Sequence, residues 1–179
     1  MSQLHDIGFK YGTDKATYHE YLNFYAKHLP GRDFNGRLLE IGIRDGSSLR
    51  MWREYYPNAE IVGIDVVKYD WTIEGVTMLE MDGTNIVDLR ELGYFDIIID
   101  DGSHMTHDQQ TTFYWLYYNQ LNEPGVYILE DLHTSYLPEY INSPKTTTQA
   151  LQDLNIKIAS YKRDPGAIDS MTAVIRAGQ

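Results

Sequence analysis

The sequence contains no cysteine among its 179 residues, which excludes disulfides, thiolate metal sites and a cysteine nucleophile. Basic residues are also few: 15 Lys and Arg face 26 Asp and Glu, and the formal net charge is -11. Because proteins that bind phosphate backbones gather Lys and Arg into a stripe, no nucleic-acid partner is expected. No apolar run approaches membrane-span or signal-peptide length, so we expect no membrane association and a cytoplasmic location.

The sequence does contain enough apolar residues for one packed domain over residues 1–179, since 42% of them are hydrophobic. Short β-branched runs alternate with helical stretches, which is typical of βαβ units and a parallel sheet. Strands are expected at 37–41, 60–66, 76–80, 95–100 and 125–130, and helices at 18–29, 47–56, 85–92 and 106–120. A weaker pattern predicts a helix at 146–154 and strands at 156–161 and 171–175. A DPG turn between those two strands suggests an antiparallel closing hairpin.

The first predicted strand runs into a glycine-containing turn, EIGIRDGS, which then opens a helix. Gly42 and Gly46 let the backbone approach a ligand, and the helix N-terminus presents free N–H groups. The third glycine of the dinucleotide fingerprint is absent, which disfavours a pyrophosphate ligand. Asp65 ends the second strand, where a carboxylate can accept both ribose hydroxyls, and Asp82 is placed to reach the purine side. Each feature alone also fits a tight turn or a strand end, but their order and spacing favour a nucleoside site.

The stretch LLEIGIRDG resembles the first motif of class I S-adenosylmethionine-dependent methyltransferases. This resemblance implies an α/β Rossmann-like fold, with a mostly parallel seven-stranded sheet, helices on both faces and an antiparallel closing strand. It also implies S-adenosylmethionine as cofactor, in a core at 37–131 between an entry segment at 1–30 and closing elements at 132–179. The residues expected to bind the cofactor are Glu40, Gly42, Gly46, Ser47, Asp65, Asp82, Asp100 and Lys15.

Acidic pairs stand at the ends of the two most apolar strands, Asp100-Asp101 and Glu130-Asp131. Neighbouring strands lie about 4.8 Å apart, so adjacent strands would bring these carboxylates into one small space. Like charges about 4 Å apart cost on the order of 4 kcal/mol per pair at an effective dielectric near 20. A hard cation such as Mg²⁺ would offset this repulsion. The alternative is that the acids cap helices or face water.

A second resemblance assigns roles to these acids. The stretches IIIDDGSH and YILEDLHTSY, with the leading segment KYGTDKATYHEYLNFY, resemble metal-dependent sugar O-methyltransferases over roughly residues 10–140. That group includes the macrocin, mycinamicin and rhamnosyl enzymes and the cephalosporin hydroxylase-like proteins. The resemblance implies that Asp101, Glu130 and Asp131 hold Mg²⁺ or another divalent cation. It also implies that His104 acts beside Asp101 as the general base.

The resulting hypothesis is methyl transfer from S-adenosylmethionine to a hydroxyl of a sugar or glycosylated small molecule. A catechol-type phenol is an alternative acceptor, and a non-catalytic cofactor-binding module is an alternative function. A nicotinamide-dependent reductase is disfavoured, because the full glycine fingerprint is missing. His107 and His133 compete with His104 as base or assist it. The aromatic residues within 113–118 are expected to be helix core or an oligomer contact, which leaves a homo-oligomer possible.

Overall fold

The computed structural model describes residues 1–154, 157–164 and 169–178. Its strands are β1 (Arg37–Ile41), β2 (Glu60–Asp65), β3 (Val76–Glu80), β4 (Phe95–Asp100), β5 (Leu121–Leu129), β6 (Ile158–Lys162) and β7 (Met171–Arg176). Its α-helices are α1 (Gln3–Tyr11), α2 (Asp14–Thr17), α3 (Leu22–Tyr25), α4 (Ser47–Tyr55), α5 (Ile86–Glu91), α6 (Thr106–Asn119) and α7 (Thr147–Gln152). Two short 3-10 helices follow β5, namely η1 (Leu132–Tyr136) and η2 (Pro138–Tyr140).

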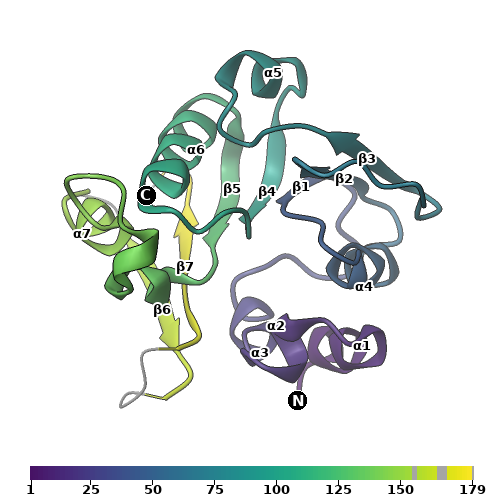
Figure 1. The fold of residues 1–179 in the computed structure, drawn as a ribbon. Coiled ribbons are helices and arrows are strands. Elements are labelled where there is room, and N and C mark those ends of the chain that lie inside the picture. The colour runs from purple at the N-terminus through teal and green to yellow at the C-terminus, as the bar shows by residue number, and fades with distance from the viewer. Residues whose placement is uncertain (155–156, 165–168, 179) are drawn as a thin grey trace.

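The seven strands form one sheet in the order β3-β2-β1-β4-β5-β7-β6 (Figure 1). The strands from β3 to β5 are parallel, and β7 runs antiparallel to both β5 and β6. The winding direction reverses between β1 and β4, and open α/β sheets bind ligands at such switch points. The predicted Rossmann-like fold with its antiparallel closing hairpin is thus confirmed, while most of the predicted DPG turn lies outside the described residues.

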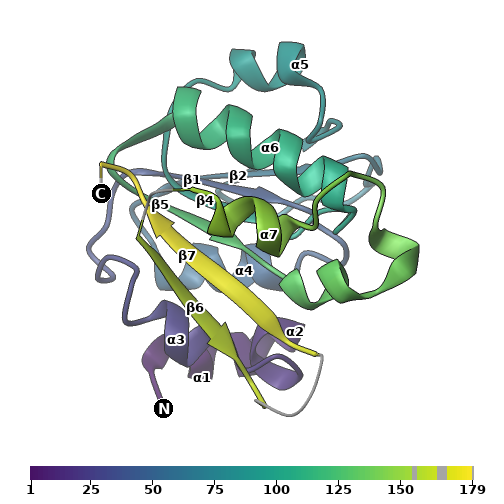
Figure 2. The same cartoon turned by 90° about the vertical axis from the view of Figure 1, so that its left-hand side faces the viewer.

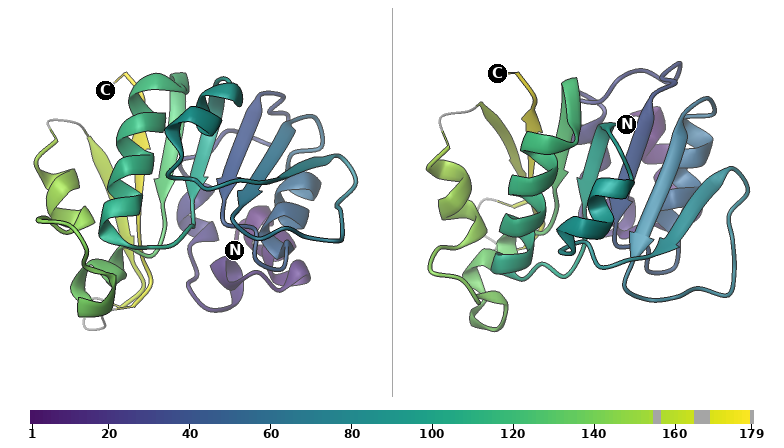
Figure 3. Two further views of the ribbon diagram at one scale, coloured as in Figure 1. Left: turned by 45° about the horizontal axis from the view of Figure 1, so that its top comes forward. Right: turned by 90° about the horizontal axis from the view of Figure 1, so that it is seen from above.

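Helices cover both faces of the sheet, and burial alternates accordingly along the central strands. Ile97 and Ile99 of β4 join a core with α1, α3 and α4, whereas Ile98 joins a core with α5, α6 and α7. Figure 2 shows these two helical layers on opposite sides of the sheet, and Figure 3 shows β3 and β6 at its opposite edges. The double cover explains why β4 and the second half of β5 are almost continuously apolar in sequence.

The predicted helix over 18–29 is wrong, and the N-terminal segment is folded differently. Glu20 has φ +59°, in the left-handed region, which interrupts any helix that starts at Tyr18. Only α3 remains helical there. The sequence analysis also missed α1, in which the Ser2 side chain accepts a hydrogen bond from the His5 N–H. α1 packs against α4, so the entry segment is part of the fold's core.

The aromatic stretch of α6 divides between the core and the surface. Phe113 and Tyr117 are buried, as predicted for helix core. Tyr114 and Tyr118 are exposed and stack on each other with an interplanar angle of 8°.

β5 begins four residues before its predicted start, and its pairing with β4 shifts register between Phe95 and Ile97. Across the part of the chain described here, no helix has the length and apolar character required to cross a membrane.

Candidate active site

The carboxyl ends of the parallel strands surround a cavity of about 810 Å³. Its volume suits a nucleoside-sized ligand, because ligand pockets commonly span about 300–1,000 Å³. The wall includes residues from each motif that the sequence analysis singled out: Gly42, Asp65, Asp82, Asp100, Asp101, His104 and Asp131. The fold therefore gathers into one cavity residues that lie up to 89 positions apart in the chain (131 minus 42).

Gly42 allows the ends of β1 and β4 to meet at this cavity. It has φ +92°, and a Cβ here would lie 2.1 Å from the carbonyl oxygen of Asp101. The Asp101 N–H donates to the Ile41 carbonyl over 2.9 Å, and the Gly42 N–H donates to the Ile64 carbonyl over 2.9 Å. The glycine is thus required by backbone packing, and that packing brings the two motifs side by side.

Asp65 presents an ionised carboxylate at the end of β2. Burial acts to raise its pKa, but the N–H groups of Val67, Ile43 and Arg44 and the Tyr69 hydroxyl together hold that pKa below its usual range. The Ile43 and Arg44 N–H groups lie 2.8 Å and 3.2 Å from Oδ2, and the Tyr69 hydroxyl lies 2.9 Å from the same oxygen. Oδ1 accepts only the Val67 N–H, at 3.0 Å, among the described residues. One oxygen therefore retains capacity for a ligand hydroxyl.

The other predicted cofactor contacts surround the cavity at different depths. Asp82 is exposed at the rim and accepts the Thr84 N–H at 2.8 Å. Asp100 is buried, and this burial raises its pKa to about 6. Lys15 and Ser47 line a neighbouring cavity of about 270 Å³, which shares Gly42 and Asp101 with the first.

Gly46 and Glu40 line neither cavity. Gly46 has φ +74° and packs against Trp71, whose ring would lie 2.6 Å from an added Cβ. Glu40 is fully buried and accepts the Ser48 hydroxyl at 2.9 Å, while burial raises its pKa to about 7. Both residues lie beside the turn after β1 and outside the two cavities. Their predicted contact with the cofactor stays a prediction.

The Lys15 side chain is buried among three carboxylates. Its ammonium bonds to Asp101 Oδ2 and lies 3.1 Å from Glu130 Oε2 and 3.4 Å from Glu40 Oε1. Burial acts to lower the lysine pKa, but the three carboxylates together raise it well above 10.5, so the ammonium stays charged. Lys15 therefore supplies part of the positive charge that the sequence analysis assigned to a metal ion alone.

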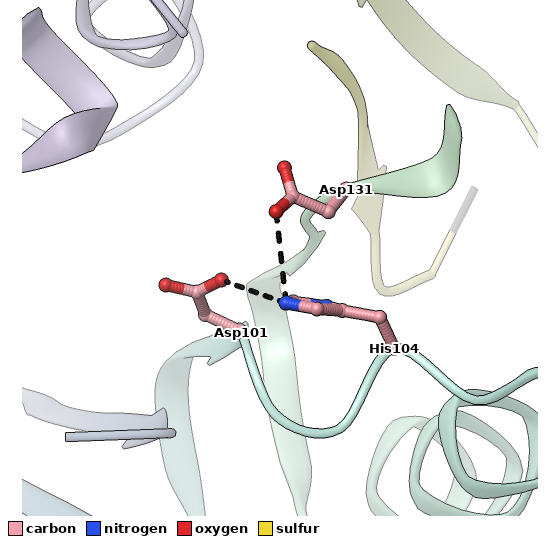
Figure 4. A group of neighbouring side chains, drawn as sticks. All are labelled: Asp101, His104 and Asp131. Atoms are coloured by element: carbon pink, nitrogen blue, oxygen red, sulfur yellow. Dashed lines mark ion pairs between the residues drawn. The ribbon is translucent and has the colours of Figure 1, made fainter. Parts of the chain in front are cut away.

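Asp101, His104 and Asp131 converge on one point beside the cavity (Figure 4). His104 Nε2 lies 3.8 Å from Asp101 Oδ1 and 3.6 Å from Asp131 Oδ2. One ligand atom from each of the three residues falls within 4.8 Å of the other two. Figure 4 shows the imidazole edge directed between the two carboxylates, which come from the ends of β4 and β5.

Strained backbone holds this arrangement. His104 has φ +59° and Asp131 has φ +53°, a region in which non-glycine residues are uncommon. The Thr134 hydroxyl lies 2.7 Å from the Asp131 carbonyl and 3.2 Å from the His104 carbonyl. This single side chain thus connects the loop after β4 to the loop after β5. Backbone strain of this kind persists only where the surrounding contacts impose it.

Glu130 does not lie with the three ligand atoms that converge beside His104. It is buried, its Oε2 pairs with Lys15, and its burial raises its pKa well above 4.5. Its Oε1 has no hydrogen-bond partner among the described residues. Glu130 is outside the group of three converging ligand atoms. Its role as a metal ligand stays a prediction, whereas Asp101 and Asp131 are placed as such a role requires.

The two competing histidines have separate environments. His107 is exposed, with its Nδ1 3.5 Å from the Asp108 carboxylate, and it neither lines the cavity nor belongs to the converging group. His133 Nδ1 lies 3.9 Å from Asp131 Oδ1, and burial lowers its pKa, which favours the neutral imidazole. Of the two, only His133 is close enough to influence the site.

Two site residues were not identified from the sequence. The Tyr21 hydroxyl donates to Asp131 Oδ1 over 2.9 Å, and His19 Nε2 lies 3.7 Å from the same oxygen. Both belong to the leading segment that carries the second resemblance, so the signal was present without a role. The predicted helix over 18–29 obscured it, because that helix would have placed these side chains on different faces.

The donor set fits a hard divalent cation. Mg²⁺ binds oxygens at about 2.0–2.1 Å in octahedral geometry, so adjacent ligand oxygens lie about 3 Å apart. The two aspartates present one oxygen each within a few ångströms of a shared point, and the cavity beside them is open to further ligands. Lys15 bonds to only one oxygen of Asp101, so the other oxygen, which faces His104, remains available to a cation.

The chain is similar in sequence to curated sugar O-methyltransferases, and no family model matches it. It is 33% identical over 150 residues to the 8-demethyl-8-alpha-L-rhamnosyl tetracenomycin-C 2'-O-methyltransferase of Streptomyces olivaceus. The aligned region covers 76% of this chain and 39% of that protein. It is 31% identical over 157 residues to the mycinamicin VI 2''-O-methyltransferase of Micromonospora griseorubida, covering 76% and 38%. The chain thus spans about two-fifths of the length of these curated relatives.

Structural comparison gives the same result. The fold matches the MycE methyltransferase of the mycinamycin pathway, solved with Mg, SAH and mycinamycin VI, with a TM-score of 0.81 and 25% identity. The match covers 98% of this chain and 55% of MycE. A second crystal structure of MycE, with Mg and SAH, gives a TM-score of 0.83. The Rossmann-like class I methyltransferase fold and the resemblance to sugar O-methyltransferases are therefore confirmed.

Proposed function

We propose that this chain is an S-adenosylmethionine-dependent, divalent-metal-dependent O-methyltransferase that acts on a hydroxyl of a sugar or glycosylated small molecule. The observation that carries the proposal is the convergence of Asp101, His104 and Asp131 within 4.8 Å beside the cavity of about 810 Å³. The named activities of the homologues support it. Because the chain matches only part of those relatives, the acceptor is proposed by class alone.

The cofactor site is assigned to the cavity around the switch point. Asp65 Oδ1, which accepts only the Val67 N–H among the described residues, binds the ribose. Asp82 reaches the purine side, and Gly42 lines the same cavity. Ser47 and Lys15 line the smaller cavity next to the metal-binding carboxylates, which suits the amino-acid end of the cofactor. Glu40, Gly46 and Asp100 complete the proposed set from behind or beside the turn.

The metal site is assigned to Asp101 and Asp131, with Glu130 as the third predicted ligand. A bound divalent cation would acidify a substrate hydroxyl and fix its position. His104 Nε2 lies between the two aspartates and takes the hydroxyl proton. The acceptor oxygen then bonds to the methyl carbon, the sulfur–methyl bond breaks, and its electron pair returns to sulfur to give neutral S-adenosylhomocysteine.

Partners and location follow from the sequence balance and the relatives. A glycoside of small-molecule size is the proposed acceptor, since MycE is solved with mycinamycin VI. The net charge of -11 supports the prediction that nucleic acid is not a substrate. A cytoplasmic location, one methyltransferase domain over residues 1–179 and a homo-oligomer formed through surfaces such as exposed Tyr114 and Tyr118 stay predictions.

Chelation and acceptor screening test the proposal together. Methyl transfer from labelled S-adenosylmethionine is measured with rhamnosides, macrolide glycosides and catechols, each with Mg²⁺ and with excess EDTA. We expect methylation of a glycoside that EDTA abolishes and Mg²⁺ restores, while binding of S-adenosylhomocysteine largely persists in EDTA. Full turnover in EDTA would reject the metal role. Methylation of catechols without any glycoside would replace the acceptor class, and tight cofactor binding with no acceptor would support a non-catalytic module.

A further inference from the structure

Two polar side chains of the leading segment contact the aspartates that are proposed as metal ligands. Lys15 bonds to Asp101 Oδ2, and the Tyr21 hydroxyl donates to Asp131 Oδ1 over 2.9 Å. Both side chains are buried, with exposed fractions of 1% for Lys15 and 0% for Tyr21. Since both come from the segment before β1, the sheet alone does not complete the surroundings of these carboxylates.

The contacts divide each carboxylate into a held oxygen and a presented oxygen. Asp101 Oδ2 is held by Lys15, and Oδ1 faces His104 Nε2 at 3.8 Å. In Asp131, Oδ1 is held by Tyr21, and Oδ2 faces the same His104 nitrogen at 3.6 Å. The two presented oxygens therefore point toward one place, where the imidazole also lies.

The Tyr21 contact sets the direction of the Asp131 carboxylate. Asp131 lies after β5 in a left-handed backbone conformation and is the N-cap residue of the 3-10 helix η1, so its backbone does not belong to the regular strand. The Tyr21 ring is fixed by stacking on His19 at 4.9 Å between ring centroids and by an edge contact with Tyr161 at 6.0 Å. Its hydroxyl also lies 3.1 Å from the Met171 carbonyl, which tethers it to β7. A rigid donor thus meets a carboxylate on a strained loop.

We propose that Tyr21 is a positioning residue for the metal site: its hydroxyl occupies Asp131 Oδ1, so that Asp131 presents Oδ2 to the cation. This inference rests on the proposed metal-dependent function and adds a contribution from the leading segment to it. Hydrogen-bond donors that orient a metal ligand typically change metal affinity about 10- to 100-fold when removed. Tyr21 does not itself line the cavity and is not one of the three converging residues, so its effect acts through Asp131.

A matched pair of variants isolates this contact. Tyr21→Phe removes only the hydroxyl and retains the packed ring. Tyr25→Phe is the control, because Tyr25 is equally buried on the same segment and its ring lies 5.7 Å from that of Tyr21. The Tyr25 hydroxyl pairs with Thr172 Oγ1 at 3.0 Å and makes no hydrogen bond to a carboxylate among the described residues.

The experiment measures Mn²⁺ binding to the S-adenosylhomocysteine complex of each protein by electron paramagnetic resonance, without acceptor. We expect Tyr21→Phe to weaken Mn²⁺ binding at least about 10-fold, with cofactor affinity unchanged, while Tyr25→Phe binds Mn²⁺ as the wild type does. Thermal unfolding of both variants reports any shared loss of packing. Equal Mn²⁺ affinity in Tyr21→Phe and wild type would overturn the positioning role, as would equal weakening in both variants. Failure of the wild-type protein to bind Mn²⁺ would instead reject the proposed metal site itself.

Discussion

At the scale of single residues, His104 combines strained backbone with a reactive position. Its φ of +59° places the imidazole between two carboxylates, and its Nδ1 is buried without a hydrogen-bond partner among the described residues. Most buried side-chain nitrogens have a hydrogen-bond partner, so this nitrogen is an exception. The Nε2 lies 3.6 Å from Asp131 and 3.8 Å from Asp101, which leaves it able to meet a substrate hydroxyl placed there.

Replacement of His104 tests the proposed general base. His104→Asn is the suitable change, because asparagine adopts positive φ more readily than most residues and so preserves the loop. We expect kcat to fall about 10²- to 10⁴-fold, the usual contribution of general-base catalysis, with the affinity for S-adenosylhomocysteine unchanged. Steady-state methyl transfer and calorimetric cofactor titration provide the two measurements.

The control for this variant is His107→Asn, three residues further on in the first turn of α6. His107 has a side chain that is 62% exposed and faces Asp108, so its loss should leave kcat within about twofold. Comparable losses in both variants would point to a general disturbance of the loop after β4. Full activity in His104→Asn would remove the histidine from the mechanism and leave His133 as the remaining candidate.

At the scale of elements, the turn after β1 and the end of β4 are joined by backbone contact. Gly42→Ala should destabilise the fold strongly, because a Cβ would lie 2.1 Å from the Asp101 carbonyl oxygen, which is backbone and cannot rotate away. The left-handed φ of +92° adds a strain of roughly 1–2 kcal/mol, and overpacking typically adds about 1–3 kcal/mol. Urea unfolding followed by tryptophan fluorescence measures the loss.

Gly12→Ala separates these two costs. Gly12 ends α1 with φ +73°, and a Cβ added there meets nothing within 4 Å. It should therefore show only the conformational strain, about 1–2 kcal/mol. If Gly42→Ala cost no more than Gly12→Ala, the close approach of β1 to β4 would be looser than the structure indicates.

The elements that the sequence predicted well are those whose pattern reflects burial. β1, β2 and β4, which are buried over most of their length, lie within a residue of their predicted bounds. The bounds of β3 were also predicted, although this edge strand has no buried residue. The entry segment was predicted poorly, since Glu20 at φ +59° stands between His19 and Tyr21, whose side chains bond to the distant residues Ser170 and Asp131. The position of Lys15 among three carboxylates was equally hidden, because each of its partners comes from a different strand end.

At the scale of the whole molecule, ligands that bind only the folded state raise its stability. A ligand at one hundred times its dissociation constant adds about 2.7 kcal/mol. For a chain of 179 residues, each kcal/mol shifts Tm by roughly 2–4 °C. S-adenosylhomocysteine should therefore raise Tm by about 5–11 °C, and thermal unfolding by circular dichroism reads this directly.

Two variants, one at the end of β2 and one in the loop that follows it, test the specificity of that shift. Asp65→Ala removes the carboxylate assigned to the ribose and should lose most of the shift, whereas Asp70→Ala makes the same charge change at an exposed position and should retain it. The Tm shifts should be compared at physiological salt. At low ionic strength any cation would stabilise a protein with a net charge of -11. Mg²⁺ should then add a further increment that EDTA removes. Equal shifts in the two variants would mean that the cofactor binds away from the carboxyl end of β2, and the cavity at the switch point would need another ligand.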